Sequence, residues 1–262
     1  MECEFEKKVS KLHEEGNYEK IIELSGSAEC DEAQRLMWVW PTFNDLQWIR
    51  DLLDNFKYKK IVSVGCGTGL LEWIIQQYLN CDVIGIEIDK SWWQSKYSPS
   101  FYLNKIIFTS KKSPVNISAD YAVLFCYFNN SEAFKSYLTD YSGHLVVVIG
   151  PEEGKNRHTD PRPFDKKFSK MGWKLHASKK LDNGIDCIAA YKIFNKFCSS
   201  VAKNWRSKDL ELKTRIEDDP DREVSVKFPR GIVLTIIVIY GIFRNLVRTN
   251  DDDDDDDDDD DE

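Results

Sequence analysis

Three glycines at alternate positions, Gly65, Gly67 and Gly69, stand where a predicted strand, 59–66, gives way to a predicted helix, 69–78. Glycine has no Cβ, so such a loop can turn tightly and let a ligand approach the backbone closely. The first turn of the helix adds N–H groups that lack partners within the helix. This spacing therefore predicts a ligand-binding loop, and the alternative is a strand-to-helix turn that binds nothing.

Two acidic residues, Glu87 and Asp89, end the next apolar run, 83–89. A carboxylate at a strand end can accept hydrogen bonds from both hydroxyls of a ribose. Asp89 falls on the same side of an extended strand as Glu87 and is the second candidate. For either residue the alternative is a carboxylate that only meets water. Trp92 and Trp93 follow, and they could stack on an adenine ring or pack a helix onto the sheet.

The glycine spacing separates two classes of cofactor site. The dinucleotide fingerprint G-x-G-x-x-G needs a third glycine at position 70, where this chain has Leu70, so a nicotinamide oxidoreductase is disfavoured. The pattern G-x-G-x-G instead resembles motif I of the class I S-adenosylmethionine-dependent methyltransferases. The resemblance covers about 45–194, and it implies S-adenosylmethionine as the cofactor. It also implies that the three glycines shape the cofactor loop and that an acidic residue at the end of the second strand binds the ribose.

Two of the chain's departures from the pattern of that family concern the methionine end of the cofactor and the methyl acceptor. The family usually has an acidic residue two positions before the first glycine, which helps to hold the methionine end of the cofactor, and this chain has Ser63 there. The fourth predicted strand ends in 125–130 without the Asn/Asp-Pro-Pro-Tyr signature of enzymes that methylate amino groups. These departures favour an alternative function, a non-catalytic binding or scaffold protein on a methyltransferase-like fold.

The loop 152–162 follows the fifth predicted strand at the same edge of the sheet. Methyl transfer is an in-line displacement that needs a positioned and deprotonated acceptor. His158 is the candidate base and Asp160 its orienting partner, whereas Arg157 and Arg162 could bind an anionic group of the acceptor. The alternative is a solvated polar loop. The sequence does not identify the acceptor, and small molecules, proteins and RNA all stay open.

The elements that would position these residues alternate between strands and helices, which predicts a parallel sheet. The run 144–149 is apolar on both faces, as expected of a strand covered by helices on both sides. Two further strands, 173–180 and 187–194, flank Asn183-Gly184, a strong hairpin signal. We therefore predict an α/β, Rossmann-like fold with a seven-stranded, mostly parallel sheet, a terminal antiparallel hairpin and helices on both faces.

The chain divides by composition into five segments. They are a helical N-terminal extension (1–40), a methyltransferase-like domain (41–197), a linker (198–230), an apolar segment (231–247) and a disordered acidic tail (248–262). The core of the apolar segment, 231–243, would span only ~20 Å as a helix, against about 30 Å of hydrocarbon. Extension to 247 includes Arg244, which could reach the interface. A membrane anchor, a docked helix and a strand are the three interpretations.

Charge and cysteine content limit the partners. The net charge is −9, but the final 12 residues are all acidic, and without them 36 basic residues face 33 acidic ones. This near-neutral balance gives no strong nucleic-acid signal. The seven cysteines contain no C-x-x-C pair, so no metal site is predicted. The first residues show no secretory signal, so a cytoplasmic location is expected, with membrane association through 231–247 as the alternative.

Overall fold

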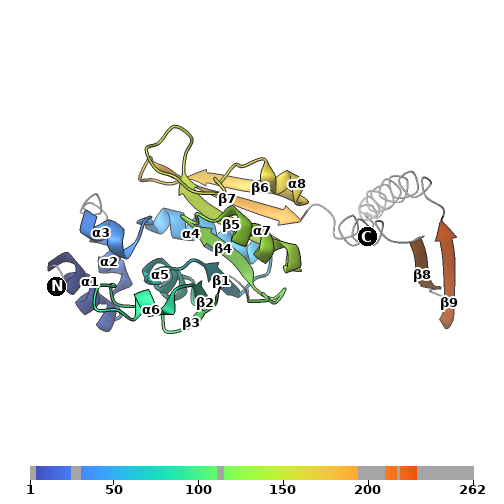
Figure 1. Cartoon of the computed structure of the whole chain (residues 1–262), viewed down its shortest axis with the longest axis horizontal. Coiled ribbons are helices and arrows are strands. Elements are labelled where there is room, and N and C mark those ends of the chain that lie inside the picture. The colour runs from blue at the N-terminus through green and yellow to red at the C-terminus, as the bar shows by residue number, and fades with distance from the viewer. Residues whose placement is uncertain (1–3, 25–30, 111–114, 194–209, 217–218, 229–262) are drawn as a thin grey trace, which may run out of the picture. The chain divides into compact units, whose positions relative to one another are not determined.

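A computed structural model of the chain describes residues 4–24, 31–110, 115–193, 210–216 and 219–228 (Figure 1). It divides into two compact units, Met1–Phe194 and Asn195–Glu262. The apolar segment 231–247 and the acidic tail 248–262 lie outside the described residues. Within the described ranges, no helix has the length and apolar character that a membrane crossing needs.

The first unit is built on a seven-stranded sheet with the order β3-β2-β1-β4-β5-β7-β6. All neighbouring pairs from β3 to β5 are parallel, and β7 is antiparallel to both β5 and β6. The predicted mostly parallel sheet with a terminal antiparallel hairpin is therefore confirmed. The strands are β1 (Lys60–Val64), β2 (Asp82–Glu87), β3 (Ile106–Phe108), β4 (Ala122–Cys126), β5 (Leu145–Pro151), β6 (Trp173–Lys180) and β7 (Asp186–Ile193).

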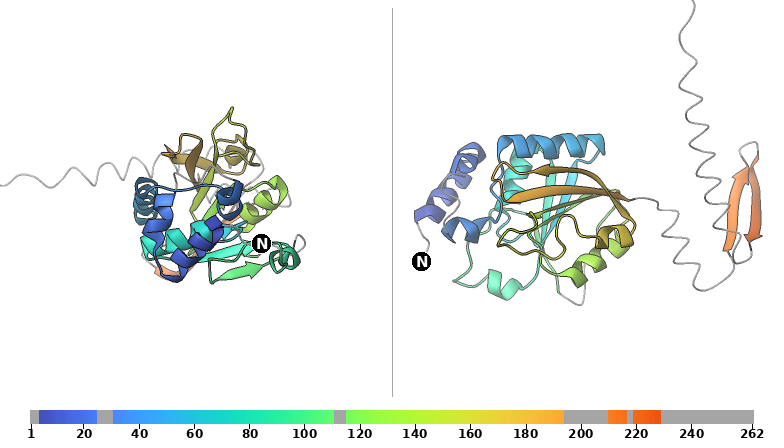
Figure 2. Two further views of the ribbon diagram at one scale, coloured as in Figure 1. Left: turned by 90° about the vertical axis from the view of Figure 1, so that its left-hand side faces the viewer. Right: turned by 90° about the horizontal axis from the view of Figure 1, so that it is seen from above.

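Helices cover both faces of this sheet. In the right-hand view of Figure 2, α4 lies on one side of the strands and α7 on the other. The helices beyond the N-terminal region are α4 (Phe43–Asn55), α5 (Leu70–Leu79), α6 (Lys90–Trp93), α7 (Ser131–Asp140) and α8 (Lys167–Lys170). The predicted cover of helices on both faces is confirmed.

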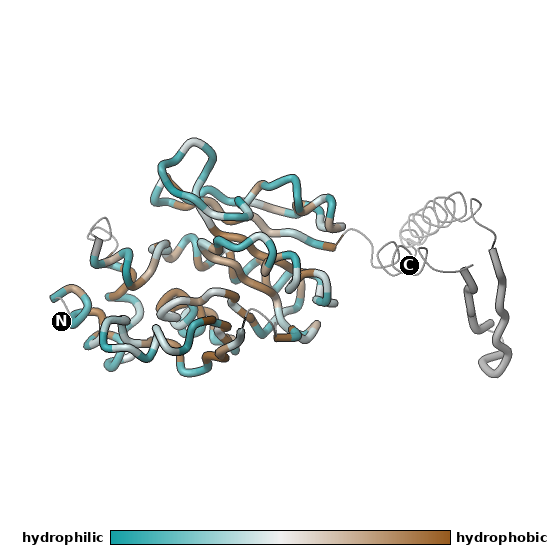
Figure 3. The backbone as a smooth tube through the Cα atoms, viewed as in Figure 1, coloured by the Kyte–Doolittle hydropathy of each residue, from teal (hydrophilic) through white to brown (hydrophobic). Residues whose placement is uncertain are grey.

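The central strands are buried on both faces, and alternate residues enter two core layers. The layer against α4 and α5 contains Ile61, Leu124 and Val147, and the layer against α7 contains Val62, Val123 and Val148. Apolar residues accordingly gather in the central strands in Figure 3. Because both faces of these strands are buried, the strands appear in the sequence as short continuous apolar runs.

Three short helices precede α4: α1 (Glu4–Glu14), α2 (Tyr18–Glu23) and α3 (Asp31–Leu36). Their buried residues belong to the same core layer as α4 and α5, for example Val9, Ile21 and Leu36. Helix α1 also contacts the backbone of the first unit, since the His13 ring nitrogen Nε2 lies 2.8 Å from the carbonyl oxygen of Tyr102. The N-terminal helices thus pack as part of the first unit.

Helix α4 begins with a side-chain cap at Thr42. Thr42 and Asp45 form a capping box, in which each side chain bonds the backbone N–H of the other residue. Asp45 is fully buried and also pairs with Lys179 on β6. The capping box therefore starts the helix and, through Asp45, also links it to the edge strand β6.

The second unit contains an antiparallel pair, β8 (Leu210–Ile216) and β9 (Asp219–Phe228). We expected residues 198–230 to be a linker, and that expectation did not anticipate these strands. The segment is rich in charged residues, which suggested solvated chain. The run 210–216 nevertheless alternates leucines with charged residues at its start, and Val224, Val226 and Phe228 recur at every second position, which is the periodicity of a strand.

Candidate cofactor site

Two hollows meet at the carboxyl ends of the central strands. The first, of about 570 Å³, lies between the glycine loop and the segment 34–38, and the second, of about 380 Å³, lies between the ends of β2 and β4. Both are lined by Gly65 and Tyr127. Each volume is of the size found for small-molecule sites, about 300–1,000 Å³. Ligands of open α/β sheets bind at the carboxyl ends of the strands. The strand order and the two hollows therefore indicate the same position for a ligand site.

The glycine loop connects β1 to α5 with all three glycines in the left-handed region of φ. A Cβ on Gly67 (φ +59°) would have Trp93 as its nearest neighbour, at 3.8 Å, so this position faces open space. A Cβ on Gly69 (φ +74°) would lie 2.5 Å from the Cβ of Leu103. The loop thus uses Gly67 to leave room above the backbone and Gly69 to pack against the chain that returns to β3.

Glu87 ends β2 beside this loop. Its Oε2 accepts a hydrogen bond of 2.9 Å from the Gly67 N–H, and its Oε1 accepts one of 2.8 Å from the Ile88 N–H. The side chain lines the second hollow. Of the residues predicted to bind a cofactor, the structure therefore brings Gly65, Gly67 and Glu87 together, at the boundary of the two hollows.

Asp89 has a different place from the one that strand alternation predicted. Strand β2 ends at Glu87, so the alternation does not extend to Asp89, whose φ is +54°. The Asp89 carboxylate caps the short helix α6 by accepting from the Trp92 N–H at 3.1 Å and from the Ser91 hydroxyl at 2.7 Å. These bonds lower the pKa of Asp89. The residue is exposed and is not among those that line either hollow.

His158 and Asp160 do not form a base and its orienting partner here. The Asp160 carboxylate accepts from the Lys167 ammonium at 2.7 Å, and this bond lowers its pKa. His158 is exposed, and neither residue is among those lining the two hollows. The loop is instead attached at its far end, where the Asp160 N–H donates to the carbonyl of Phe128 at 3.0 Å.

Arg157 and Arg162 both face carboxylates. Arg157 lies 3.8 Å from the buried carboxylate of Asp186 and donates to the Tyr127 hydroxyl at 3.3 Å. Arg162 lies 3.6 Å from Glu153 on the surface. The charge of Arg157 is thus largely balanced within the protein, which weakens its candidacy as a binder of an anionic substrate group.

Tyr127 forms the wall between the two hollows. Its hydroxyl donates to Asp186 at 2.7 Å, and its ring stacks on Trp38 with centroids 5.2 Å apart and planes 14° from parallel. Burial, and then this hydrogen bond to Asp186, raise the pKa of Tyr127. The hydroxyl therefore stays protonated at neutral pH, and what Tyr127 presents to the hollows is mainly an aromatic surface.

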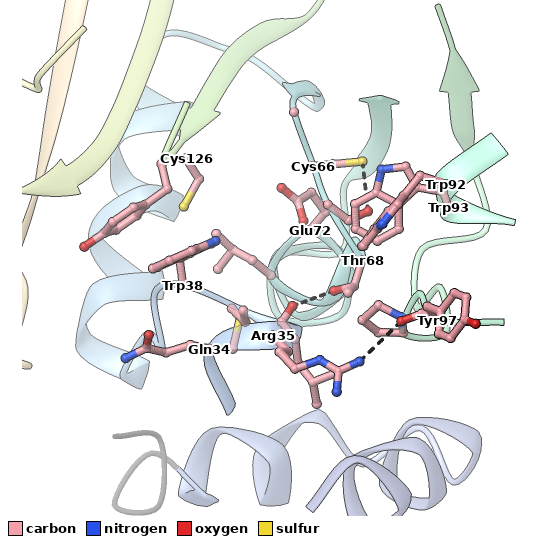
Figure 4. Close-up of a pocket in the computed structure, with 17 residues that line it drawn as sticks. Gln34, Arg35, Trp38, Cys66, Thr68, Glu72, Trp92, Trp93, Tyr97 and Cys126 are labelled. Carbon is pink, nitrogen blue, oxygen red and sulfur yellow. Dashed lines mark hydrogen bonds between the residues drawn. The ribbon is translucent and has the colours of Figure 1, made fainter. Parts of the chain in front are cut away.

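Trp92 and Trp93 both line the first hollow, opposite Trp38. They contact each other edge to face, with centroids 4.7 Å apart, and Trp92 keeps 47% of its surface exposed. Figure 4 shows the pair above Thr68, beside Cys66. Trp92 thus presents an exposed ring to the first hollow, whereas Trp93 also packs on the ring of Phe101, with centroids 5.4 Å apart.

The first hollow also contains two charged residues that we did not select from the sequence, Glu72 on α5 and Arg35 on α3. Glu72 is 2% exposed, and its Oε1 accepts a 2.6 Å hydrogen bond from the Ser63 hydroxyl. One signal could have found it, because Glu72 is the only charged residue in the otherwise apolar start of the helix, 70–75. Arg35 had no such signal.

Comparisons with known proteins place no relative close to this chain. No protein-family model matches it, and no curated protein matches its sequence. Among solved structures, a magnesium protoporphyrin IX methyltransferase from Synechocystis PCC 6803 with bound S-adenosylmethionine is 11% identical over 57% of this chain and 78% of that one, with a TM-score of 0.38.

Two other solved structures are as remote. A methyltransferase dependent on S-adenosylmethionine from Aquifex aeolicus is 11% identical over 66% of this chain and 98% of that one (TM-score 0.39). Human N-acetylserotonin methyltransferase in complex with S-adenosylmethionine is 15% identical over 66% and 59% (TM-score 0.40). The fold assignment therefore rests on the strand order itself, which is that of the predicted seven-stranded, mostly parallel sheet with a terminal antiparallel hairpin.

Proposed function

We propose that this chain binds S-adenosylmethionine across the two hollows and transfers its methyl group to an acceptor that enters the first. One observation carries the proposal: the Glu87 carboxylate is hydrogen-bonded to the Gly67 N–H at the boundary of the hollows. A carboxylate that can bind a ribose and a glycine loop that a ligand can approach thereby lie side by side at the carboxyl ends of the strands. In this arrangement the second hollow takes the adenosine and the first takes the methionine end.

The cofactor would supply an electrophilic methyl group on a positively charged sulfur. The chain contributes position and environment. The stacked rings of Trp38 and Tyr127 present aromatic faces, which attract a cation. Trp92 and Trp93 line the opposite side of the same hollow. Holding donor and acceptor in line in this way is the main demand of the reaction.

The second candidate function is a binding or scaffold protein that does not turn over. It is favoured by the places of the two predicted base candidates, since neither His158 nor Asp160 lines the hollows. Lys167 holds Asp160, and the hydroxyl of Tyr127 is bonded to Asp186. An acceptor that is already nucleophilic needs no base, so methyl transfer to such an acceptor is compatible with this site.

Methyl transfer from isotopically labelled S-adenosylmethionine tests the proposal. The full chain would be incubated with separate pools of small molecules, RNA and proteins, and Glu87→Ala would serve as the matched variant. We expect label in one pool with the wild type and much less with the variant. Binding of the cofactor without transfer to any pool would favour the scaffold function.

A further inference from the structure

The carboxylate of Glu72 is half satisfied. Ser63 donates its hydroxyl to Oε1, whereas Oε2 is buried and has no donor among the described residues. In Figure 4 Glu72 lies between Cys126 and Trp38 on one side and Thr68 and Trp92 on the other. A buried acceptor without a partner costs about 1–3 kcal/mol, and more when it carries a charge. Such a group at the wall of a hollow points to a ligand that donates to it.

Electrostatics indicate the charge of that ligand. Burial raises the pKa of Glu72 to about 7, and the nearby negative charge of Glu87 adds to the effect. The other groups that face it are the Ser63 hydroxyl and the thiols of Cys66 and Cys126, whose own pKa values are raised, chiefly by burial and further by Glu72. No described residue around Glu72 supplies a positive charge to balance it. A cationic ligand group would therefore stabilise the ionised form.

The position of Glu72 relates it to the missing acidic residue of the strand. The resemblance to the methyltransferases implies an acid at position 63, where this chain has Ser63. Ser63 is fully buried and donates its hydroxyl to Glu72. The carboxylate is thus supplied by the first turn of α5, and the serine orients it.

The first hollow also holds a group of opposite charge. Arg35 lines it, and a guanidinium nitrogen of Arg35 donates a long hydrogen bond of 3.4 Å to the carbonyl of Tyr97. Figure 4 shows this side chain on the side of the hollow nearest the N-terminal helices, away from Cys126. A carboxylate and a guanidinium in one hollow are complementary to an α-amino acid group, which carries an ammonium and a carboxylate.

We propose that Glu72 binds the α-ammonium group of the cofactor's methionine end and that Arg35 binds its carboxylate. This assignment rests on the proposed function, and it names the residues of this chain that replace the missing strand acid. It predicts that the contribution of Glu72 to affinity depends on the amino-acid part of the ligand and not on the adenosine part.

Two ligands separate these parts. S-adenosylhomocysteine contains adenosine and the amino-acid end, whereas 5′-methylthioadenosine contains adenosine without it. Calorimetric titration of the full chain would compare the wild type, Glu72→Gln, Arg35→Gln and the exposed charge control Glu19→Gln. Glutamine keeps the volume and an acceptor for Ser63 but removes the charge. Thermal unfolding of each variant would show that it is folded.

We expect Glu72→Gln to weaken S-adenosylhomocysteine by at least about tenfold and to leave 5′-methylthioadenosine unchanged. Arg35→Gln should show the same selectivity with a smaller loss, because its side chain is more exposed, and Glu19→Gln should change neither affinity. Equal binding of S-adenosylhomocysteine by wild type and Glu72→Gln, or equal losses for both ligands, would overturn the assignment and leave the proposed function standing. A wild type that binds neither ligand would overturn both.

Discussion

Glu87 has two tasks in this structure, since its carboxylate braces the glycine loop through Gly67 and lines the hollow assigned to adenosine. The two tasks are compatible, because a carboxylate has about four acceptor positions and the Gly67 and Ile88 N–H groups use two of them. The remaining positions are available to the hydroxyls of a ribose.

Replacing Glu87 should therefore weaken every ligand that contains the ribose. For Glu87→Ala we expect the affinity for S-adenosylhomocysteine and for 5′-methylthioadenosine to fall by at least about tenfold each, since one charge-assisted bond contributes ~1.5–3 kcal/mol. Asp89→Ala should leave both affinities unchanged, because Asp89 caps α6. Calorimetry on the two variants checks this, and the reverse pattern would mean that the ribose lies at Asp89.

Glu72 gives the protein a pH-dependent stability. Its pKa is about 7 in the folded chain against an ordinary value of 4.5, so the folded state holds this proton more tightly than the unfolded state. Stability therefore falls as the pH rises through this window, and the full cost is present above pH 7 and absent below pH 4.5.

In Glu72→Gln this dependence disappears. Without ligand, the unfolding free energy of the variant relative to the wild type should grow by up to about 3 kcal/mol between pH 4.5 and 7.5. Urea denaturation across this range measures the difference, with Glu19→Gln as the exposed control that should stay flat. A constant difference between Glu72→Gln and wild type would show that folding does not raise the pKa of Glu72.

At the scale of elements, the loop between β1 and α5 needs glycine at two positions for different reasons. Gly67 faces the first hollow, and Gly69 contacts Leu103. Both have positive φ, which a residue with a Cβ adopts at a cost of about 1–3 kcal/mol. The two positions differ in the atoms that an added side chain would contact.

Gly67→Val should abolish cofactor binding and keep the sheet folded, since its side chain would extend into the space above the loop. Gly69→Ala should instead lower the thermal stability first, because its Cβ would lie 2.5 Å from the Cβ of Leu103. Circular dichroism and calorimetry on both variants distinguish the two effects. Unchanged affinity in Gly67→Val would exclude the loop as the binding site.

The sequence predicted the strands well where burial is continuous and less well elsewhere. Strand β5 is buried along all seven of its residues, so its apolar run was unambiguous. By contrast, the chain between β2 and β3 has no continuous apolar run: only Lys90–Trp93 forms a helix there, and the Tyr102 N–H further along donates to the carbonyl of Thr68 at 2.9 Å. The pairing of β8 with β9 was hidden by charged residues.

The candidate site was predictable in the same uneven way. A glycine loop is local, so its conformation follows from spacing alone. The environment of Glu72, the capping role of Asp89 and the ion pair of Asp160 depend on residues that are distant in sequence or on where a strand ends. Periodicity cannot report such contacts.

At the scale of the whole molecule, the N-terminal helices and the cofactor site belong to one unit. The Thr68 hydroxyl in the glycine loop donates to the carbonyl of Leu36 at 2.6 Å, and the segment 34–38 lines the first hollow. The site therefore includes residues of the region that precedes the sheet, which the sequence analysis predicted as a helical N-terminal extension.

Removing residues from the N-terminus should destabilise the protein, whereas removing the acidic residues from the C-terminus should not. Deleting 1–24 removes the buried side chains of Val9, Ile21 and Ile22, so both the unfolding temperature and the cofactor affinity should fall. Deleting 251–262 should change neither, because eleven consecutive aspartates repel one another and offer no apolar surface to bury. Differential scanning fluorimetry and calorimetry on the two truncated chains check both expectations, and a loss of stability on removing the aspartates would contradict the second.

The central claim is that the edge formed by the glycine loop and Glu87 binds S-adenosylmethionine. Its most direct test is calorimetric titration of the full chain with S-adenosylmethionine, S-adenosylhomocysteine and NAD, one after another. We predict saturable binding of the first two at one site per chain and no binding of NAD, because Leu70 replaces the third glycine of a dinucleotide loop. A folded chain that binds NAD, or that binds neither S-adenosyl compound, would contradict the account.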